Sequence, residues 1–506
     1  MSELLNSNSM NTEKIFWFFL TSLTFFRLIY IFFIPVTPQE AYYWYYSQYP
    51  AWSYFDHPPM AAYSIWVGTQ LFGNSIFGVK FVGLFWSALT NILIFYTTRK
   101  MIVYNQSGFE NKATASLPLI AVLLYNLTTF AHIYAVSTMP DTPLLFFWML
   151  VLFTVQEALQ TQKKSWWFAA GAALGFGLMS KYTMIAIVPS VFLYLLIEKE
   201  HRAQLLKPWP YLAILIAAVI FSPVIFWNQQ HEWASFIFQF GERAEAMKPI
   251  RFKYFGQLVG SQMFILTPFV FVLFLVVTWK IISQWKSKTK FHFFFLSAMI
   301  ITGGFILISL RSLVKMNWLL PGYLGLIMIS ASLCHSEFKC TSRWLRSGAI
   351  VSIILITAAH LIWLIPNIPL GEGNTWSGWQ DAAKQVFEIQ KELGGKDKVF
   401  IFSNSYKGAS LMKFYLPDQQ DVYAQNVYKE PALQFDFWPL PDSLEGKDAL
   451  YIFSNRREYP NDLMKVRRYF DEVNLLKTFE YQFFGEKTRT IFCYLAKNYH
   501  SIQWIK

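Results

Sequence analysis

The sequence has few charged residues and few cysteines for its length. Only 15% of its 506 residues are charged, whereas a soluble protein carries roughly a quarter. The three cysteines, Cys334, Cys340 and Cys493, are scattered and lack zinc-like spacing, so neither a disulfide framework nor a metal knuckle is indicated. There is no glycine-rich phosphate loop, which argues against nucleotide binding through such a loop.

Long apolar runs dominate what is present. Hydrophobic residues make up 54% of the chain, and runs near the ~20 residues needed to cross a bilayer recur from Ile15 to Pro366. The first run is too long for a signal-peptide core and has no clear small-x-small cleavage site, so we expect a retained signal anchor. The sequence therefore predicts a polytopic α-helical membrane protein with about eleven spans. The predicted spans are 15–35, 76–98, 114–136, 142–160, 166–180, 182–197, 209–228, 256–279, 291–310, 318–334 and 347–366.

Basic residues in alternate loops predict the orientation. Because the net charge of +12 gathers in these loops, we do not interpret it as a nucleic-acid footprint, and we expect no nucleic-acid partner. By the positive-inside rule the basic loops lie in the cytoplasm. The loop 36–75, the Lys181 turn, the loops 229–255 and 311–317, and everything after Pro366 then lie outside. The basic residues are Arg99, Lys100, Lys112, Lys163, Lys164, Lys199, Arg202, Lys207, Lys280, Lys286, Lys288, Lys290, Lys339, Arg343 and Arg346.

The composition changes after Pro366, where three glycines (Gly371, Gly373 and Gly378) suggest a linker. An amphipathic pattern predicts a helix over 381–393, and apolar runs predict buried strands at 399–402 and 449–453. Further helices are expected near 405–414 and 461–472. Alternating strands and helices indicate a small C-terminal α/β domain. We therefore divide the chain into a membrane domain, 1–366, which includes the outer loop 36–75, and a soluble domain, 367–506.

The first outer loop combines carboxylates, a histidine and many aromatic residues. Glu40 follows Pro38 and Gln39, which suits either the start of a helix or a general base in half-apolar surroundings. Asp56 and His57 precede two prolines, which stiffen the backbone. We favour a fixed ligand or phosphate-binding position here over an ordinary turn.

Two further residues stand at ends of predicted spans. Asp141 opens the fourth span and is either an N-cap or a site carboxylate, since an acid at membrane depth is costly unless it serves a function. Lys181 lies in an apolar turn and needs an anionic partner, for which a phosphate is suitable. The alternative for Lys181 is that its amine reaches toward water.

Other outer loops supply a histidine and more cations. His231 can join Asp56 and His57 around a divalent metal cation, although a lone histidine is more often structural. Arg243 and Lys315 are candidates for binding a phosphate, and a role facing lipid headgroups is equally compatible with Arg243.

Together these segments resemble the GT-C membrane glycosyltransferases, specifically the bacterial family 39 enzymes, which include protein O-mannosyltransferases and the aminoarabinose transferase acting on lipid A. The family typically has an Asp-Glu pair in the first outer loop, whereas this chain has Gln39-Glu40. The substitution leaves Glu40, Asp56 or Asp141 as the base. The segments that carry the resemblance are 38–46, 54–60, 140–148, 178–182, 222–243, 317–323 and 434–438.

The resemblance implies an inverting transfer of a sugar from a polyprenyl-phosphate donor to a glycan, lipid or protein acceptor. The site would face outward from a bacterial inner membrane, with the C-terminal domain in the periplasm. His57, Lys181, Arg243 and Lys315 would bind the donor phosphate, and Asp56 and His231 a metal if one is used. The alternatives are a lipid-linked sugar flippase and a non-enzymatic assembly subunit. The absence of an internal repeat and the clustering of acids at one surface weaken the flippase.

Overall fold

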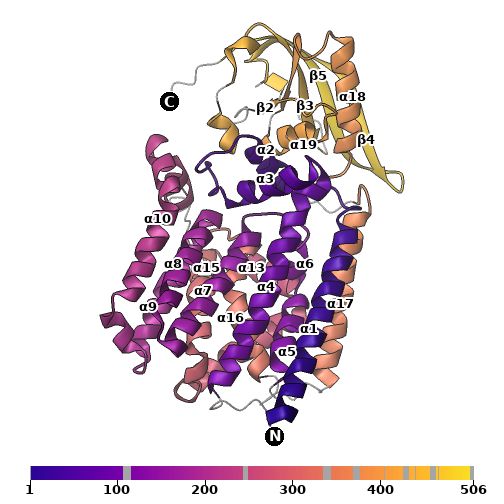
Figure 1. Cartoon of the computed structure of the whole chain (residues 1–506). Helices are drawn as coiled ribbons and strands as arrows, with labels where there is room; N and C mark the ends of the chain where they lie inside the picture. The colour runs from indigo at the N-terminus through magenta and orange to yellow at the C-terminus, as the bar shows by residue number, and fades with distance from the viewer. Residues whose placement is uncertain are drawn as a thin grey trace. The chain divides into compact units, whose positions relative to one another are not determined.

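The protein is described from a computed structural model (Figure 1). The structure describes residues 2–105, 115–242, 249–333, 343–368, 376–403, 405–424, 432–438, 440–455, 463–464 and 466–501. The chain forms two compact units, each made of two separate stretches. Unit 1 comprises Met1–Phe32 and His57–His360, and unit 2 comprises Phe33–Asp56 and Leu361–Lys506. The division therefore passes through the first outer loop, between Asp56 and His57, as well as near the change of composition at Pro366.

Unit 1 is built from helices (Figure 1). The longer ones are α1 (Ser2–Tyr30), α3 (Met60–Phe72), α4 (Ile76–Asn105), α5 (Leu117–Asn126), α7 (Asp141–Thr161), α8 (Lys164–Ser180), α9 (Ile187–Ile197), α10 (Trp209–Gln230), α13 (Phe252–Leu266), α14 (Pro268–Ser283), α15 (His292–Ser309), α16 (Leu320–Leu333) and α17 (Arg343–Leu364). The short ones are α6 (Thr129–Ile133), η1 (Tyr182–Ala186), η2 (Arg202–Leu206), α11 (Ala234–Phe236), η3 (Ile237–Glu242), η4 (Trp285–Ser287), η5 (Thr289–Phe291) and η6 (Met316–Leu319).

Several of these helices are long and apolar enough to cross a membrane. Within the described residues there are six, or seven if the bent pair α13 and α14 is one span. The six are Ile76–Met101, Asp141–Thr161, Trp209–Gln230, Thr289–Ser309, Met316–Leu333 and Arg346–Leu364. These helices confirm the polytopic membrane class.

Two segments predicted as single spans are broken. The predicted span 256–279 consists of α13 and α14, which meet at an angle of 111°. The break is at Thr267, where φ is +66° and the next residue is Pro268, and the residue before a proline is disfavoured in helical geometry. The predicted span 114–136 consists of the short helices α5 and α6, because the Thr128 side chain accepts a hydrogen bond from the Ala131 N–H and starts a new helix. Both predictions of a continuous helix are therefore wrong.

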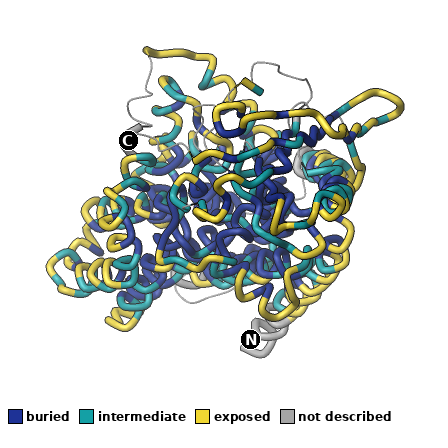
Figure 2. Tube along the Cα trace, turned by 90° about the horizontal axis from the view of Figure 1, so that it is seen from above, coloured by how far each residue is buried: buried dark blue, intermediate teal, exposed yellow. Residues whose placement is uncertain are grey.

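The outer helices of unit 1 expose apolar side chains. In the apolar windows of α10 and α17 only 17% and 11% of residues are buried, against 83% in α7. Exposed residues include Leu215 and Val219 on α10 and Ile353 and Ile354 on α17. Such continuous apolar faces fit contact with lipid hydrocarbon. Figure 2 shows buried stretches enclosed by exposed ones. Helix α7, which begins at Asp141, is thus a central helix of the bundle.

Unit 2 contains a mixed five-stranded sheet in the order β2-β1-β3-β5-β4. Strands β2, β1 and β3 are parallel, whereas β5 is antiparallel to both β3 and β4. Helix α19 packs on β1 and β3, and α18 packs on α19. The elements are α2 (Pro38–Gln48), α18 (Trp379–Glu392), β1 (Val399–Ser403), α19 (Tyr406–Tyr415), β2 (Val422–Ala424), η8 (Leu433–Asp436), η9 (Asp442–Leu444), β3 (Asp448–Asn455), β4 (Phe470–Phe483) and β5 (Glu486–Tyr499).

The α/β character predicted for the C-terminal region is confirmed. Strands β1 and β3 and helices α18 and α19 lie where the apolar runs and the amphipathic pattern placed them. The helix predicted over 461–472 is wrong at its end, because β4 begins at Phe470. Residues 461, 462 and 465 of that prediction lie outside the described residues. The β4–β5 hairpin was not predicted. Strand β4 is largely exposed and its apolar residues do not form a run, whereas β5 does contain an apolar run at 491–496.

Helix α2 belongs to unit 2, although it lies near the start of the chain. Nearly all of its residues are buried, including Tyr42 and Trp44, so the helix must have packing partners on nearly all sides. Tyr42 packs on Tyr406 with ring centroids 4.6 Å apart, and Trp44 packs edge-on against Phe414 at 4.9 Å. Helix α19 is therefore the main partner of α2 in the described part of unit 2.

Candidate functional site

A buried polar group joins three helix ends in unit 1. Lys181 Nζ donates a hydrogen bond to Asp141 Oδ1 at 2.7 Å, and Asn317 Nδ2 donates to Asp141 Oδ2, also at 2.7 Å. Asp141 and Lys181 are 2% and 5% exposed. A buried ion pair is maintained only where good geometry and further hydrogen bonds offset the cost of desolvation. Here both oxygens of the Asp141 carboxylate accept a hydrogen bond.

Local structure explains why these side chains meet. Asp141 is the first residue of α7 and its side chain makes no capping hydrogen bond, so it does not act as the N-cap considered above. Lys181 ends α8 in an extended conformation, with φ −161° and ψ 138°. Asn317 lies in η6, directly before α16. The anionic partner that the sequence requires for Lys181 is Asp141.

A second buried lysine lies beside the segment that leads to Asp141. Lys80 of α4 is fully buried, and its Nζ donates to the Val136 carbonyl at 3.3 Å. Thr138 holds the same segment against α4, because its hydroxyl donates to the Val79 carbonyl at 2.7 Å and accepts from the Gly83 N–H at 3.1 Å. Sequence reasoning missed Lys80. Its signal is a lysine inside an apolar run long enough to span the membrane.

A second candidate group lies in unit 2, around Asp56. The carboxylate Oδ1 accepts hydrogen bonds from Tyr42 at 3.1 Å and from Tyr46, and Asp56 is 6% exposed. Gln434 connects this group to the tail of the chain through two hydrogen bonds. Its side-chain oxygen accepts from the Phe55 N–H at 2.7 Å, and its backbone N–H donates to Tyr42 Oη at 3.0 Å. Burial and the nearby Asp56 charge raise the pKa values of Tyr42 and Tyr46 well above the usual value, so both hydroxyls remain donors.

Glu40 forms a capping box at the start of α2. Its Oε2 accepts hydrogen bonds from the Thr37 N–H and the Thr37 hydroxyl, both at 3.0 Å, and Thr37 Oγ1 accepts from the Glu40 N–H at 3.2 Å. This is the helix-start role that was considered for it, although the residue is completely buried rather than on the surface. The aromatic residues around it pack inside unit 2.

His57, His231 and Lys315 are less enclosed than the residues above. His57 is half-buried and is the first residue of the second stretch of unit 1. His231 stacks on Trp227 with ring centroids 4.0 Å apart, and its Nδ1 lies 2.8 Å from the Trp227 carbonyl oxygen. Lys315 is exposed and directly precedes η6, which carries Asn317. Arg243 lies outside the described residues.

The structure therefore brings Asp141 and Lys181 together in unit 1 and places Glu40 and Asp56 in unit 2. Among the residues that the structure describes, no group of three His, Cys, Asp or Glu side chains is arranged to hold a metal ion. The divalent cation predicted at Asp56 and His231 is therefore not supported by a set of three such side chains in the described part of the chain. Hydrogen-bond donors and ammonium groups are the charge-stabilising elements that are present.

Comparison with known proteins identifies relatives over part of the chain. A family model described as dolichyl-phosphate-mannose-protein mannosyltransferase matches residues 56–227. Lipid A galacturonosyltransferase RgtD of Rhizobium johnstonii is 25% identical over 194 residues, which cover 38% of each chain. An undecaprenyl phosphate-alpha-4-amino-4-deoxy-L-arabinose arabinosyl transferase of Erwinia tasmaniensis is 26% identical over 34% of this chain and 30% of its own length. The matched segments thus span less than half of these relatives.

The fold is shared over nearly the whole length with two solved structures. ArnT from Cupriavidus metallidurans in the apo state aligns with a TM-score of 0.63 and 12% identity over 95% of this chain and 98% of that chain. The same protein bound to undecaprenyl phosphate aligns with a TM-score of 0.61 and 13% identity over 94% and 97% of the two chains. The chain therefore has the GT-C fold of membrane glycosyltransferases, including a small C-terminal sheet domain.

Proposed function

We propose that the protein is an inverting membrane glycosyltransferase. It transfers a sugar from a polyprenyl-phosphate donor to an envelope acceptor, which is lipid A or lipopolysaccharide, another glycan, or a protein. The shared fold with ArnT, which is also solved with undecaprenyl phosphate, supports the donor class. The lipid A and aminoarabinose transferases among the relatives support the acceptor class. The observation that carries the proposal is the buried Asp141–Lys181–Asn317 group on this fold.

The reaction needs cations more than it needs a strong acid. The acceptor oxygen forms a bond to the anomeric carbon while the bond from that carbon to the phosphate oxygen breaks, and the electron pair leaves with the phosphate. This leaving group is already anionic, so fixed positive charge stabilises the transition state. We assign this role to Lys181, which Asp141 holds in place, and further to His57, Arg243 and Lys315.

The proton of the acceptor passes to a carboxylate. Asp141 uses both oxygens to bind Lys181 and Asn317, so we assign it to positioning Lys181. Glu40 serves the capping box of α2. We therefore assign the base to Asp56, which two tyrosine hydroxyls orient, with Glu40 as the second candidate. A divalent cation bound by Asp56 and His231 stays a prediction, tested by turnover after chelation and after metal is added back.

The proposal places the reaction on the outer face of a bacterial inner membrane, with the C-terminal region in the periplasm. The basic loops of the sequence and the bacterial origin of the relatives support this side.

The experiment uses purified full-length protein in nanodiscs with a panel of polyprenyl-phosphate sugars and envelope extracts. Consumption of one donor, with equimolar release of polyprenyl phosphate, is the expected result. Asp56→Asn should reduce this release, while Asp418→Asn, an exposed carboxylate in unit 2, should not. Flux of a lipid-linked sugar across the membrane with no donor consumed would instead establish the flippase.

A further inference from the structure

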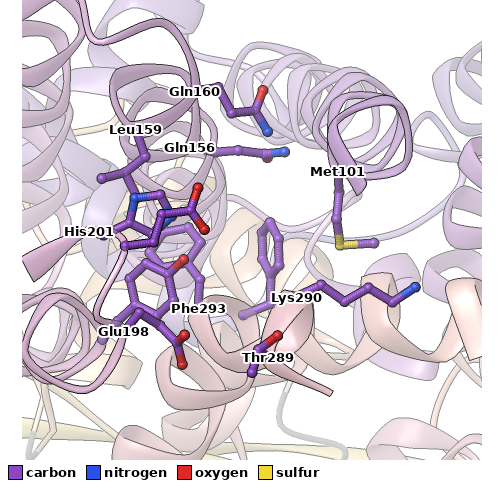
Figure 3. A pocket seen from close by; sticks show the side chains of 12 residues that line it. Met101, Gln156, Leu159, Gln160, Glu198, His201, Thr289, Lys290 and Phe293 are labelled. Carbon is purple, nitrogen blue, oxygen red and sulfur yellow. The ribbon is translucent and has the colours of Figure 1, made fainter. Parts of the chain in front are cut away.

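Two places outside the groups around Asp141 and Asp56 combine charged and aromatic side chains. The first is a cavity of about 140 Å³ at the end of α7, shown in Figure 3. Its carboxylate Glu198 is bonded to His292, and the side-chain oxygen of Gln156 is buried away from the open space. Neither acceptor is therefore free to bind a ligand in this cavity.

The second place is a patch on unit 2, where the end of α2 lies beside α19 (Figure 1). It consists of Tyr45, Tyr49, Lys413, Asp421 and Trp438, and we call it the Tyr49 patch. Tyr45 and Tyr49 stack with ring centroids 5.7 Å apart, and Trp438 packs on these two rings at 5.1 and 5.4 Å. Tyr49 is 40% exposed and Trp438 is half-buried, so both rings border the solvent.

An ion pair holds the patch together. Asp421 Oδ1 accepts hydrogen bonds from Lys413 Nζ and from Tyr49 Oη. The Lys413 ammonium also lies over the rings of Tyr45 and Tyr49, at 4.7 and 5.3 Å from their centroids. Lys413 thus balances the charge of Asp421, and the patch has no net charge. Because the rings and the carboxylate are held in place before a ligand arrives, binding costs less entropy.

Two polar groups of the patch remain available to a ligand. Within the described part of the chain no hydrogen bond reaches Asp421 Oδ2, and the Asp421 side chain is 38% exposed. The Trp438 indole N–H has no acceptor among the described residues either, and its nitrogen is not fully buried. The patch therefore presents one charged acceptor and one donor beside aromatic rings.

A sugar ring matches this combination of groups. Its C–H face is apolar and packs on an aromatic ring, while its hydroxyls both donate and accept hydrogen bonds. A hydroxyl that donates to Asp421 makes a charge-assisted hydrogen bond. A hydrocarbon chain would leave both polar groups without a partner. A phosphate would be repelled by the free carboxylate oxygen of Asp421.

We propose that the Tyr49 patch binds a neutral sugar of a glycan acceptor. One hydroxyl donates to Asp421 Oδ2, a neighbouring oxygen accepts from Trp438 Nε1, and the C–H face lies against the exposed part of Tyr49. Trp438 also packs edge-on against Tyr46 at 5.8 Å, and Tyr46 donates to Asp56. The patch thus adjoins the carboxylate assigned as the base. That the glycan is the acceptor rests on the proposed function, whereas the binding of the sugar does not.

The test is frontal affinity chromatography on immobilised full-length protein in nanodiscs, with no sugar donor present. The probes are oligosaccharides released from envelope extracts with mild acid and separated into a neutral and an anionic fraction. We expect at least one neutral oligosaccharide to be retained, and mass spectrometry identifies it. Wild-type protein that retains no neutral oligosaccharide would overturn the proposal, and so would a preference for the anionic fraction.

Variants assign the retained sugar to the patch. Trp438→Phe keeps an aromatic ring and removes the N–H, so the affinity should fall about fivefold. Tyr49→Ala removes the exposed ring and should lower the affinity about tenfold. Phe484→Ala, which removes a 93% exposed ring at the turn between β4 and β5, is the matched control and should leave the affinity unchanged. Wild-type affinity in Trp438→Phe or in Tyr49→Ala would contradict the assignment.

Turnover separates this inference from the proposed function. With the retained oligosaccharide as acceptor, Trp438→Phe should raise KM about fivefold and leave kcat unchanged, because it removes binding alone. Retention of the sugar without any donor consumption would support the sugar site and contradict the glycosyltransferase. Donor consumption with an unchanged KM in Trp438→Phe would support the glycosyltransferase and contradict the acceptor role of the patch.

Discussion

At the scale of single residues, the buried Asp141–Lys181 pair of unit 1 lies at the ends of two helices. Asp141 begins α7 and Lys181 ends α8, so two charges that are unfavourable in an apolar bundle neutralise each other. Each residue could be singled out from the sequence, because ionisable groups in apolar runs are rare. Their pairing could not, since it depends on how helices separated in sequence pack together. Asn317 comes from a third segment, which the resemblance includes as 317–323, but nothing in the sequence showed that it pairs with Asp141.

Removing one partner of this pair should destabilise the protein strongly. Lys181→Met leaves the Asp141 carboxylate buried without its cation, and we expect a loss of about 3–5 kcal/mol in unfolding free energy. The double variant Lys181→Met with Asp141→Leu should regain most of it. Lys391→Met, which breaks the exposed pair of Lys391 with Glu388, is the control and should cost less than about 1 kcal/mol. A double variant that regains both stability and turnover would show that the pair is structural only.

The Asp56 group makes a prediction about turnover. Asp56→Asn keeps the shape of the side chain and removes the base, so we expect the rate of donor consumption to fall about 10²–10⁴-fold. Tyr46→Phe removes one hydroxyl that orients Asp56 and should reduce the rate less. Tyr481→Phe, which removes a hydroxyl bonded to Gly378, is the control. A rate in Asp56→Asn within about twofold of the wild type would transfer the role to Glu40.

The stability of unit 2 should depend on pH through Asp421. Burial favours its protonated form, but hydrogen bonds from Lys413 and Tyr49 outweigh this and lower the pKa of Asp421 below its ordinary value. A lowered pKa in the folded state stabilises the fold above the unfolded value, and this contribution is lost as the pH falls through the folded value. The unfolding midpoint of Asp421→Asn should therefore lie below that of the wild type near neutral pH, and the gap should close in strong acid. Asp418→Asn should show no such closure.

At the scale of helices and strands, the close packing of α8 against α10 depends on glycines that let the two backbones approach each other. Gly171 and Gly175 lie one turn apart on α8, where α8 meets α10. A Cβ added at Gly171 would lie 2.4 Å from the Ala213 carbonyl oxygen, and one at Gly175 would lie 2.7 Å from Ile220 Cβ. Small residues at this spacing allow membrane helices to approach closely. The α8–α10 contact therefore depends on the absence of side chains.

A larger residue at this contact should separate the two helices. Gly171→Val should destabilise the protein by about 1–3 kcal/mol, the range for overpacking, because the nearest atoms belong to the backbone of Ala213 and cannot rotate away. The control is Gly303→Val in α15, where an added Cβ meets nothing within 4 Å. Thermal unfolding of both variants in the same detergent measures the difference. Equal midpoints would show that α8 and α10 can move apart at little cost.

Local signals allowed part of these elements to be predicted. Strand β1 is a short continuous run of apolar residues and α18 has the apolar period of an amphipathic helix, so each has a recognisable pattern in the sequence. The break at Thr267 also has a local signal in Pro268. No local signal in the sequence shows that α2 belongs to unit 2, because this depends on contacts between distant parts of the chain, such as that of Tyr42 with Tyr406. Lys80 was missed because it lies inside a predicted span rather than at its end.

At the scale of the whole molecule, each unit is assembled from two separate stretches, and the chain enters unit 2, returns to unit 1 and enters unit 2 again. The exposed apolar helices α10 and α17 indicate that unit 1 is the part in the membrane. Unit 2 has a sheet with its own core, which includes Phe400, Tyr451 and Phe492.

The proposed sidedness can be measured with reporter fusions. A reporter that is active only in the periplasm should be active when fused after Ser501 and inactive when inserted at Lys286, because the two positions lie on opposite sides in our proposal. A reporter active only in the cytoplasm should give the reverse pattern. Periplasmic activity at Lys286 would contradict the orientation. The insertion site, Lys286, is exposed in the short helix η4, and expression level serves as the control for folding.

The pairing of α2 with α19 has a consequence for biosynthesis. Helix α2 leaves the ribosome more than 350 residues before its partner Tyr406–Tyr415, an interval of roughly 20–70 s at about 5–20 residues per second. During this interval the tyrosines and Trp44 of the nascent chain have no α19 to cover them, and a chaperone must shield them or they remain exposed to the solvent. A stop codon late in the gene would therefore disable a loop that was translated near its beginning.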